Sequence, residues 1–148
     1  MASSAVPAAV DALLGLVRGA FAGQAVRVDD GPPITDLDEP DAIGVGVSVE
    51  TGAPGTAYRG FHVGSTDESF GLTCVAQSWS GDTELATRRT RVFELLDTVD
   101  TVLEQTPDLG LPGRVIDARI ESWDYRPIQD GRGCLALVEF TVRINTYR

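Results

Sequence analysis

Residues 70–105 read FGLTCVAQSWSGDTELATRRTRVFELLDTVDTVLEQ, a β-forming run followed directly by a long helical pattern. The run that begins at Phe70 has Thr, Cys and Val in series, which predicts a strand. Ser80, Gly81 and Asp82 end that strand, because these residue types mark turns. This stretch contains no catalytic motif, so we look for the function in the surfaces of the protein.

The helical pattern predicts a long amphipathic helix. We expect the Asp82 carboxylate to cap it and Glu84 to favour its first turn, where the helix dipole attracts negative charge. Arg89 falls at the edge of the apolar stripe, and Arg88 and Arg91 are expected to point away from it. The stripe itself recurs at helical spacing and consists of Leu85, Val92, Phe93, Leu96, Val99 and Leu103.

A second helix is expected near the N-terminus. Pro7 suits a first helical turn, and Gly23 is a signal for the C-terminal end. A short strand at 24–28 follows, and Pro32 and Pro33 close it because successive prolines cannot continue a β-ladder. The apolar stripe of this helix is one-sided and needs a partner surface; it consists of Val10, Leu13, Leu14, Val17 and Phe21.

Two segments between the predicted helices have contrasting composition. Residues 43–49 alternate bulky aliphatic residues with Gly44 and Gly46, which predicts a strand with a bare face that another backbone can approach. Residues 36–41 are an acidic loop without the glycine and the terminal glutamate of the familiar calcium-binding loop. We therefore expect this loop to be solvated.

Two strands are predicted near the C-terminus, at 115–125 and at 134–144, with a hairpin signal at Asp130-Gly131 between them, although Pro127 and Gly133 indicate a looser loop. The apolar stripe of the long helix is expected to pack on one face of these strands, on Ile116, Ile120, Val138, Phe140 and Val142. The order of elements predicts one α+β domain over residues 1–148. We expect two layers: a mostly antiparallel sheet of about five strands, with two helices packed on one face.

Residues 51–69 show no periodicity and are rich in glycine. Loops of this length are uncommon inside compact domains and are usually functional or disordered. We expect this loop to be mobile in the free subunit and to order against a neighbouring protein surface; the competing interpretation is that Phe61 folds back on its own sheet. His62, the only histidine, has no partner at a spacing useful for catalysis. The candidate interface residues are Tyr58, Arg59, Phe61, His62 and Val63.

The chain is acidic, with 22 acidic and 12 basic residues and a formal net charge of −10. This argues against binding to nucleic-acid phosphates, which requires clustered Lys and Arg, and against docking on anionic membranes. There is no run with the length of a membrane span and no secretion-signal pattern. We therefore expect a protein of a reducing cytoplasm, with no metal or cofactor, in which Cys74 and Cys134 are free thiols.

Taken in order, several short segments resemble the tail terminator family of long-tailed bacteriophages, the family of the phage lambda terminator. One is the opening helix followed by a strand and VDDGPP at 28–33. Another is QSWSG at 77–81, which leads straight into the long helix. The others are LPGRV at 111–115 and DG at 130–131. The resemblance covers nearly the whole chain except 51–69, which varies in such proteins.

The resemblance implies a virion protein that is not an enzyme. Members of the family form a ring, typically sixfold, on the head-proximal end of the tail tube; the ring stops tube polymerisation and docks the head connector. The implied partners are other copies of the chain, the tail tube protein and a head connector or neck protein. DNA would only pass through the bore, and the place of the protein would be the tail–neck junction, after assembly in the bacterial cytoplasm. Other neck, head-completion or tail tube proteins of phages or gene transfer particles remain open.

Two other classes of function are weaker. A small hydrolase would draw on Asp, Glu and His62, but the sequence offers no nucleophile–base pair, phosphate loop or metal cluster. A small-ligand module has no motif for or against it. In a ring, acidic residues facing the bore would repel DNA phosphates and let the genome slide, although acidity also serves solubility. The candidates are Asp36, Asp38, Glu39 and Asp41, or Asp117, Glu121 and Asp124.

Overall fold

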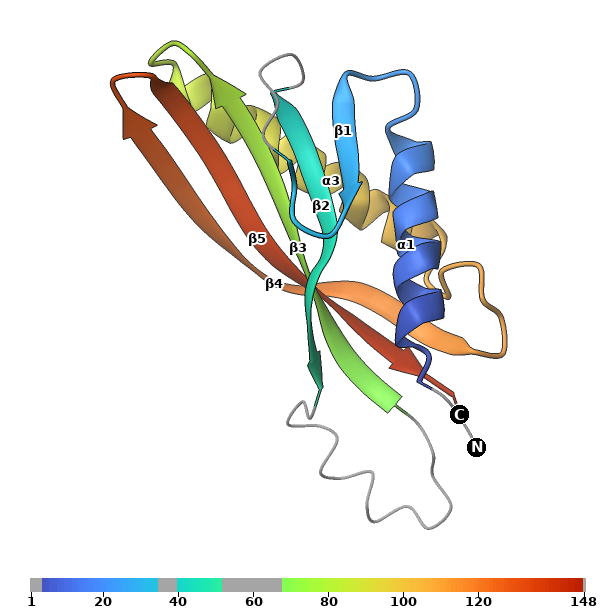
Figure 1. Ribbon diagram of the computed structural model, residues 1–148. Coiled ribbons are helices and arrows are strands. Elements are labelled where there is room, and N and C mark those ends of the chain that lie inside the picture. The colour runs from blue at the N-terminus through green and yellow to red at the C-terminus, as the bar shows by residue number, and fades with distance from the viewer. Residues whose placement is uncertain (1–3, 35–39, 52–67, 148) are drawn as a thin grey trace.

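The computed structural model describes residues 4–34, 40–51 and 68–147, which form one mixed sheet and two helices (Figure 1). The fold is therefore α+β, as the sequence predicts. The helices are α1 (Val6–Ala20) and α3 (Leu85–Gln105). The strands lie in the order β1-β2-β3-β5-β4. Their bounds are Val26–Asp30 for β1, Asp41–Thr51 for β2, Glu68–Ser80 for β3, Val115–Asp130 for β4 and Gly133–Thr146 for β5.

One pair of strands departs from the antiparallel pattern that we expected. β1 pairs parallel with β2, from Val26 opposite Asp41 to Asp30 opposite Val45, whereas the other three pairs are antiparallel. The prolines after β1 end that strand, but they do not fix the direction in which the next strand enters the sheet. Pro32 and Pro33 therefore predict the end of β1, but they do not predict that β1 and β2 form an antiparallel hairpin.

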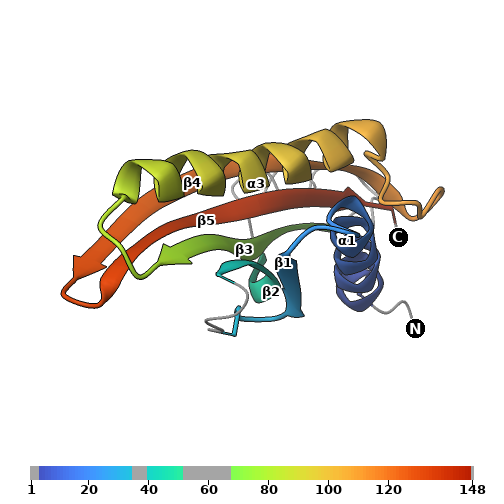
Figure 2. The same cartoon turned by 90° about the horizontal axis from the view of Figure 1, so that it is seen from above.

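The helices and the sheet share one core. α3 lies along the sheet over β3, β5 and β4, and α1 lies beside β1 and β2 (Figures 1 and 2). Side chains of both helices and of β2 to β5 form a single buried cluster. The predicted stripe of α1 is confirmed: Leu13, Leu14, Val17 and Phe21 are buried, and Val10 packs against them half-buried.

The buried face of α3 is close to the predicted one. Leu95, which the predicted stripe omits, is fully buried, whereas Phe93 and Leu85 are only partly buried at the margin of the core. The contact face is therefore rotated slightly toward Leu95. The predicted residues that are buried are Val92, Leu96, Val99 and Leu103.

The start of α3 differs from the prediction. The helix begins at Leu85, and Glu84 occupies the N-cap position without a side-chain cap. A capping side chain must reach a backbone N–H two or three residues further on, inside the first turn. The Asp82 carboxylate instead accepts a hydrogen bond from the Glu84 N–H at 2.9 Å, before the first turn. This hydrogen bond holds the pKa of Asp82 below its usual value.

β5 follows the predicted alternation along its whole length. Its even-numbered residues from Cys134 to Ile144 are buried against the helices, and Val138, Phe140 and Val142 lie in the core as predicted. The hairpin to β4 is also confirmed, because Asp130 pairs with Gly133 across a two-residue turn. Both cysteines, Cys74 and Cys134, are free and buried.

β4 breaks the alternation twice. Ile120 packs against the core as predicted, and Ala118 is buried there too, but Ile116 is 39 % exposed and its neighbour Val115 is buried in its place. The cause is a register shift between Val115 and Asp117, since a bulge adds a residue to one strand, so the alternation that places Ala118 and Ile120 toward the core does not extend back to Ile116. The predicted contact between Ile116 and α3 is therefore wrong.

A second register shift in β4 lies between Ile120 and Ser122. Beyond it, the side chains that point to α3 have odd numbers, and the rings of Trp123 and Tyr125 both lie against Phe93. The ring centroids are 5.2 Å and 5.6 Å apart, respectively. This shift brings two aromatic side chains to the margin between the edge strand and the helix.

The bare face of β2 is approached by another backbone, as predicted, and that backbone belongs to the same chain. A Cβ added at Gly44 would collide with the Gly31 carbonyl oxygen and would lie 2.6 Å from Pro33 Cδ. The segment that follows β1 thus crosses directly over Gly44. Because this face is occupied within the subunit, it is not available for contacts with other subunits at Gly44.

Candidate functional site

The predicted interface residues fall outside the part of the chain that the structure describes. Tyr58, Arg59, Phe61, His62 and Val63 lie in 52–67, and Asp36, Asp38 and Glu39 lie in 35–39. The bounds predicted for the long loop need correction at both ends. Thr51 is the last residue of β2, and Glu68 and Ser69 begin β3.

Asp41, which we expected in a solvated loop, is an anchor for α3. It opens β2 and is only 9 % exposed. Its Oδ2 accepts a hydrogen bond from Arg91 Nε at 2.8 Å, and its Oδ1 accepts one from Ser78 Oγ at 2.6 Å. Arg88 Nη1 lies 3.7 Å from Oδ1 and donates to Ser78 Oγ at 2.9 Å. The hydrogen bond to Asp41 raises the pKa of Arg91 above its usual value.

This cluster corrects two predictions. Arg88 and Arg91, expected to point away from the apolar stripe of the helix, are half-buried and reach Asp41 at the start of β2. Arg89, expected at the edge of the stripe, is the exposed arginine of the three. Helical spacing shows which side chains flank the core, but it does not reveal a carboxylate on another strand that binds them. Both carboxylate oxygens of Asp41 accept hydrogen bonds within this cluster. Asp41 is therefore not available to face a bore that contains DNA.

The second acidic set does not form a site either. Asp117, Glu121 and Asp124 lie on β4, and each is held by its own partner, so the three carboxylates share no ligand position. The partners are Asn145 Nδ2 at 2.7 Å from Asp117, Arg143 Nη2 at 2.9 Å from Glu121 and Arg126 Nε at 2.9 Å from Asp124. Each carboxylate thus makes a polar contact with a neighbouring side chain on the face of β4 that is turned away from α3.

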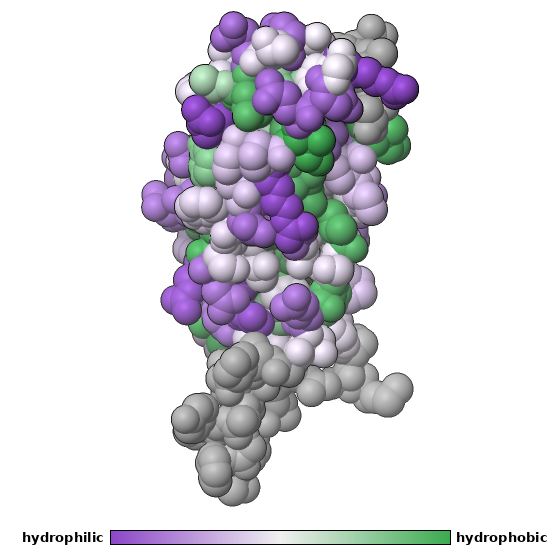
Figure 3. Space-filling model, turned by 90° about the vertical axis from the view of Figure 1, so that its left-hand side faces the viewer, coloured by the Kyte–Doolittle hydropathy of each residue, from purple (hydrophilic) through white to green (hydrophobic). Residues whose placement is uncertain are grey.

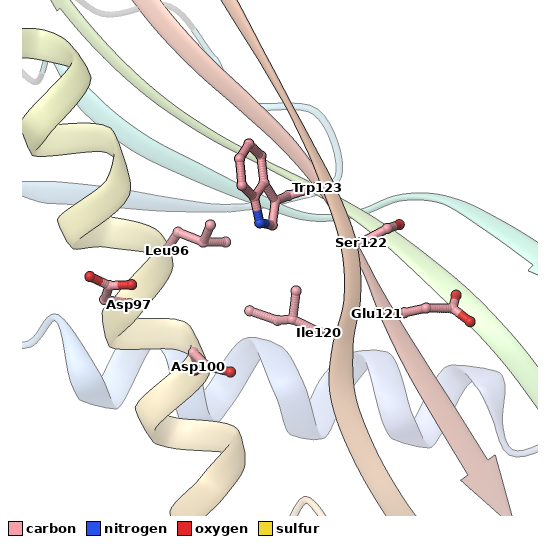
Figure 4. Close-up of a pocket in the computed structure, with 7 residues that line it drawn as sticks. All are labelled: Leu96, Asp97, Asp100, Ile120, Glu121, Ser122 and Trp123. Atoms are coloured by element: carbon pink, nitrogen blue, oxygen red, sulfur yellow. The ribbon is translucent and has the colours of Figure 1, made fainter.

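A groove of about 290 Å³ lies between α3 and β4 (Figure 4). Leu96 enters it from the helix, and Ile120 and Trp123 enter it from the strand. Asp97 and Asp100 stand on the helical rim. Within the described residues, neither carboxylate has a hydrogen bond or an ion pair. The groove therefore combines an apolar floor with two unneutralised negative charges.

Trp123 is exposed and yet held in place. Its side chain is 55 % exposed, and its ring meets Phe93 edge-on at an interplanar angle of 82°. A large aromatic side chain that is already ordered loses little entropy when a partner covers it. Exposed Trp side chains of this kind dominate the binding energy of many protein interfaces. The groove thus has a preorganised anchor beside its acidic rim.

A second apolar patch, which we call the tip patch, lies at the turn of the β4–β5 hairpin. The strand registers place Trp79, Leu135 and Ile128 in one row across β3, β5 and β4, on the face away from the helices. Ile128 is 53 % exposed. Arg132, in the turn, is exposed, and its guanidinium has no partner among the described residues. Figure 3 looks at this side and shows apolar groups among hydrophilic ones.

Neither edge of the sheet is suited to pairing with an added strand. β4 carries two register shifts and also Pro127, which has no N–H to donate. β1 has five residues, and Arg18 of α1 donates to its Val28 carbonyl at 3.4 Å. Bulges, prolines and covered carbonyls all discourage pairing between edges. Association at β4 would therefore use side-chain surfaces such as the groove and the tip patch.

Other features of the described residues carry less chemistry. A second hollow of about 330 Å³ lies between α1 and the end of α3, and no ionised side chain lines it. The described ranges contain no group of His, Cys, Asp and Glu that could hold a metal ion. Neither described helix is long and apolar enough to cross a membrane.

Comparison of the sequence with models of protein families and with curated proteins found no match. The groove and the tip patch are therefore interpreted from their own chemistry. Sequence reasoning missed both, although one signal was present. After Ile120 the large side chains move to odd positions, at Trp123 and Tyr125, and such a change of phase indicates a bulge.

Proposed function

We propose that this chain is a structural protein of a phage tail that forms a ring at the head-proximal end of the tail tube. The ring ends tube polymerisation and docks the head connector or a neck protein. The resemblance of the ordered segments to tail terminators motivates the proposal. The observation that carries it is the groove between α3 and β4, where an ordered, exposed Trp123 stands beside two unpaired carboxylates.

The features of this groove are those of a protein-docking surface rather than of a reaction centre. Asp97 and Asp100 are three residues apart on α3, and both are exposed to solvent. A general acid or base works best in a site where burial or a neighbour tunes its pKa. An apolar floor with a charged rim is the arrangement found at protein interfaces.

The charge of the chain supports the part of the proposal that concerns DNA. The formal charge of −10 per subunit gives any ring a strongly acidic character, and DNA would pass its bore without specific binding. Asp41 and the predicted acidic residues of β4 have partners within the subunit, whereas Asp36, Asp38 and Glu39 lie outside the described residues and remain a prediction for the bore. Asp97 and Asp100 are unpaired but belong to the groove.

Native mass spectrometry and negative-stain microscopy of the purified protein test the proposal. We expect a closed ring, of six subunits by the resemblance, either in solution or on the ends of purified tail tubes. Tubes mixed with the protein should stop growing at a fixed end. A protein that stays monomeric and leaves tube growth unchanged would contradict the proposal. Binding along the tube wall or to the head connector alone would favour a tube, neck or head-completion protein instead.

A further inference from the structure

We propose that the subunits associate head to tail, with the tip patch of one copy seated in the groove between α3 and β4 of the next. This inference rests on the proposed ring and names the contact that builds it. The occupant of the groove is thus a second copy of this chain. The two surfaces are different parts of the molecule, so the contact is heterologous, which is the type that generates rings.

The first argument is chemical complementarity. The groove offers an apolar floor of Leu96, Ile120 and Trp123 with Asp97 and Asp100 on its rim. The tip patch offers the exposed Ile128 and, two residues beyond the end of β4, Arg132, whose guanidinium has no partner among the described residues. Each surface holds one exposed large apolar side chain, Trp123 in the groove and Ile128 at the tip, together with unpaired charge, and the charges of the two surfaces are of opposite sign.

The second argument concerns the acidic residue nearest to Arg132. Asp130 could neutralise the arginine within the turn, but its Oδ1 accepts a hydrogen bond from the backbone N–H of Arg132 at 2.7 Å. The carboxylate is therefore oriented by the turn, and the guanidinium has no ion pair within the described residues. Arg126, further back on β4, is already paired with Asp124 at 2.9 Å. Of the two arginines near the tip, Arg126 and Arg132, only Arg132 has a guanidinium without a partner among the described residues.

The third argument is the position of the hairpin. The turn between β4 and β5 forms one extreme end of the molecule, whereas the groove lies on the flank midway along α3 (Figures 1, 2 and 4). A protruding end that docks on the flank of the next copy leaves the end of that copy free to repeat the contact. The bulges and Pro127 keep β4 from pairing with a second strand, so the side chains at the tip and in the groove make the contact.

The test uses one variant for each surface. The groove variant is Asp97→Arg with Asp100→Arg, and the tip variant is Ile128→Ser with Arg132→Ser. All four positions are exposed, so both variants should unfold at the wild-type temperature. We expect each variant alone to be monomeric at the concentration where the wild type forms rings, with assembly shifted to about tenfold higher concentration or more. The control, Asp11→Arg with Asp30→Arg, repeats the charge change on exposed positions of α1 and β1 and should assemble normally.

Mixing the two variants separates a head-to-tail contact from the alternatives. The groove variant keeps an intact tip, and the tip variant keeps an intact groove, so one contact can form between them. The groove and the tip that remain free in this dimer both carry substitutions, so no further subunit can be added. We expect the mixture to stop at dimers in native mass spectrometry. Rings formed by either variant alone, or a mixture that stays monomeric, would overturn the proposed contact while leaving the ring function intact. A wild-type protein that is monomeric both in solution and on tube ends would instead overturn the proposed function, and this contact with it.

Discussion

β5 and β4 form one hairpin, yet they have opposite characters. β5 lies between two strands, alternates without interruption, and buries every even-numbered side chain from Cys134 to Ile144. β4 lies at the edge, shifts register twice, and from Glu121 onward exposes every side chain except that of the half-buried Tyr125. The even-numbered side chains of β5 are buried in the core, and β5 has a neighbouring strand on each side. The side chains of the edge strand β4 from Glu121 onward are mostly exposed and can make other contacts. The centre of the sheet therefore holds the fold, and the edge carries the surfaces that we propose for association.

The largest expected effect is at the centre. Phe140 is buried at 1 % exposure and is among the largest fully buried side chains. We expect Phe140→Ala to lower the free energy of unfolding by about 3–5 kcal/mol, because the cavity it leaves can be filled only partly. Urea unfolding followed by circular dichroism measures the change. A loss below 1 kcal/mol would show that β5 does not hold the core in the way described.

The next effect concerns the polar anchor of α3. Asp41→Ala removes the acceptor of Arg91 and Ser78 and leaves Arg88 without its nearby carboxylate. We expect a loss of about 1–3 kcal/mol, since the arginines are partly exposed and can regain water. Arg89→Ala is the matched control on the same helix and should cost less than about 0.5 kcal/mol, because Arg89 is exposed. Equal effects of the two substitutions would mean that the Asp41 cluster does not anchor the helix.

The same contrast explains how far the sequence could predict the fold. β5, α1 and α3 were predictable because each buries one regular face, so apolar spacing alone reports its position. The parallel direction of β1 was not, because the signal that ends a strand does not encode the direction of the next one. Ile116 was placed in the core by strict alternation, and the bulge beside Val115 reverses it. Two of the register shifts lie on the edge strand β4, and a third lies between Gly44 and Ser48 of β2, which has a neighbour on each side.

The candidate site was predicted less well than the fold. The groove depends on which side chains of β4 face α3, and that depends on the second register shift after Ile120. The roles of Arg88 and Arg91 depend on Asp41, which is 50 residues from Arg91 in the sequence. Local patterns carry no information about such distant partners. The predicted interface residues from Tyr58 to Val63 remain a prediction, since they lie outside the described residues.

A smaller effect on stability is expected at the edge. Trp123→Ala removes a half-exposed ring and its edge-on contact with Phe93, so we expect a loss of about 0.5–1.5 kcal/mol. Its effect on assembly should be much greater than its effect on folding, because Trp123 stands in the groove. Thermal unfolding and native mass spectrometry on the same sample measure both. If the Trp123→Ala protein assembled normally but lost as much stability as Phe140→Ala, Trp123 would serve the fold rather than association. That result would contradict the proposed difference between the edge and the centre of the sheet.

The smallest expected differences concern the reactivity of cysteine thiols rather than stability. They can be measured at the centre of the sheet and at the exposed end of β4. Cys74 lies on β3 opposite Phe140, and burial raises the pKa of its thiol to about 12. At pH 8 almost none of it is thiolate, which is the form that reacts with alkylating reagents. Cys74 should therefore react only when the centre of the sheet opens, and both native cysteines should be alkylated without reductant once the protein is unfolded.

A cysteine introduced by Ile128→Cys lies at the exposed end of β4 and should react at once in the free subunit. In the ring, the proposed contact should protect this introduced thiol while leaving Cys74 unchanged. Mass spectrometry after timed alkylation reads both sites in one sample. Rapid labelling of Cys74 in the folded protein would show that the centre is open, and equal labelling of the introduced cysteine in subunit and ring would remove the tip from the interface.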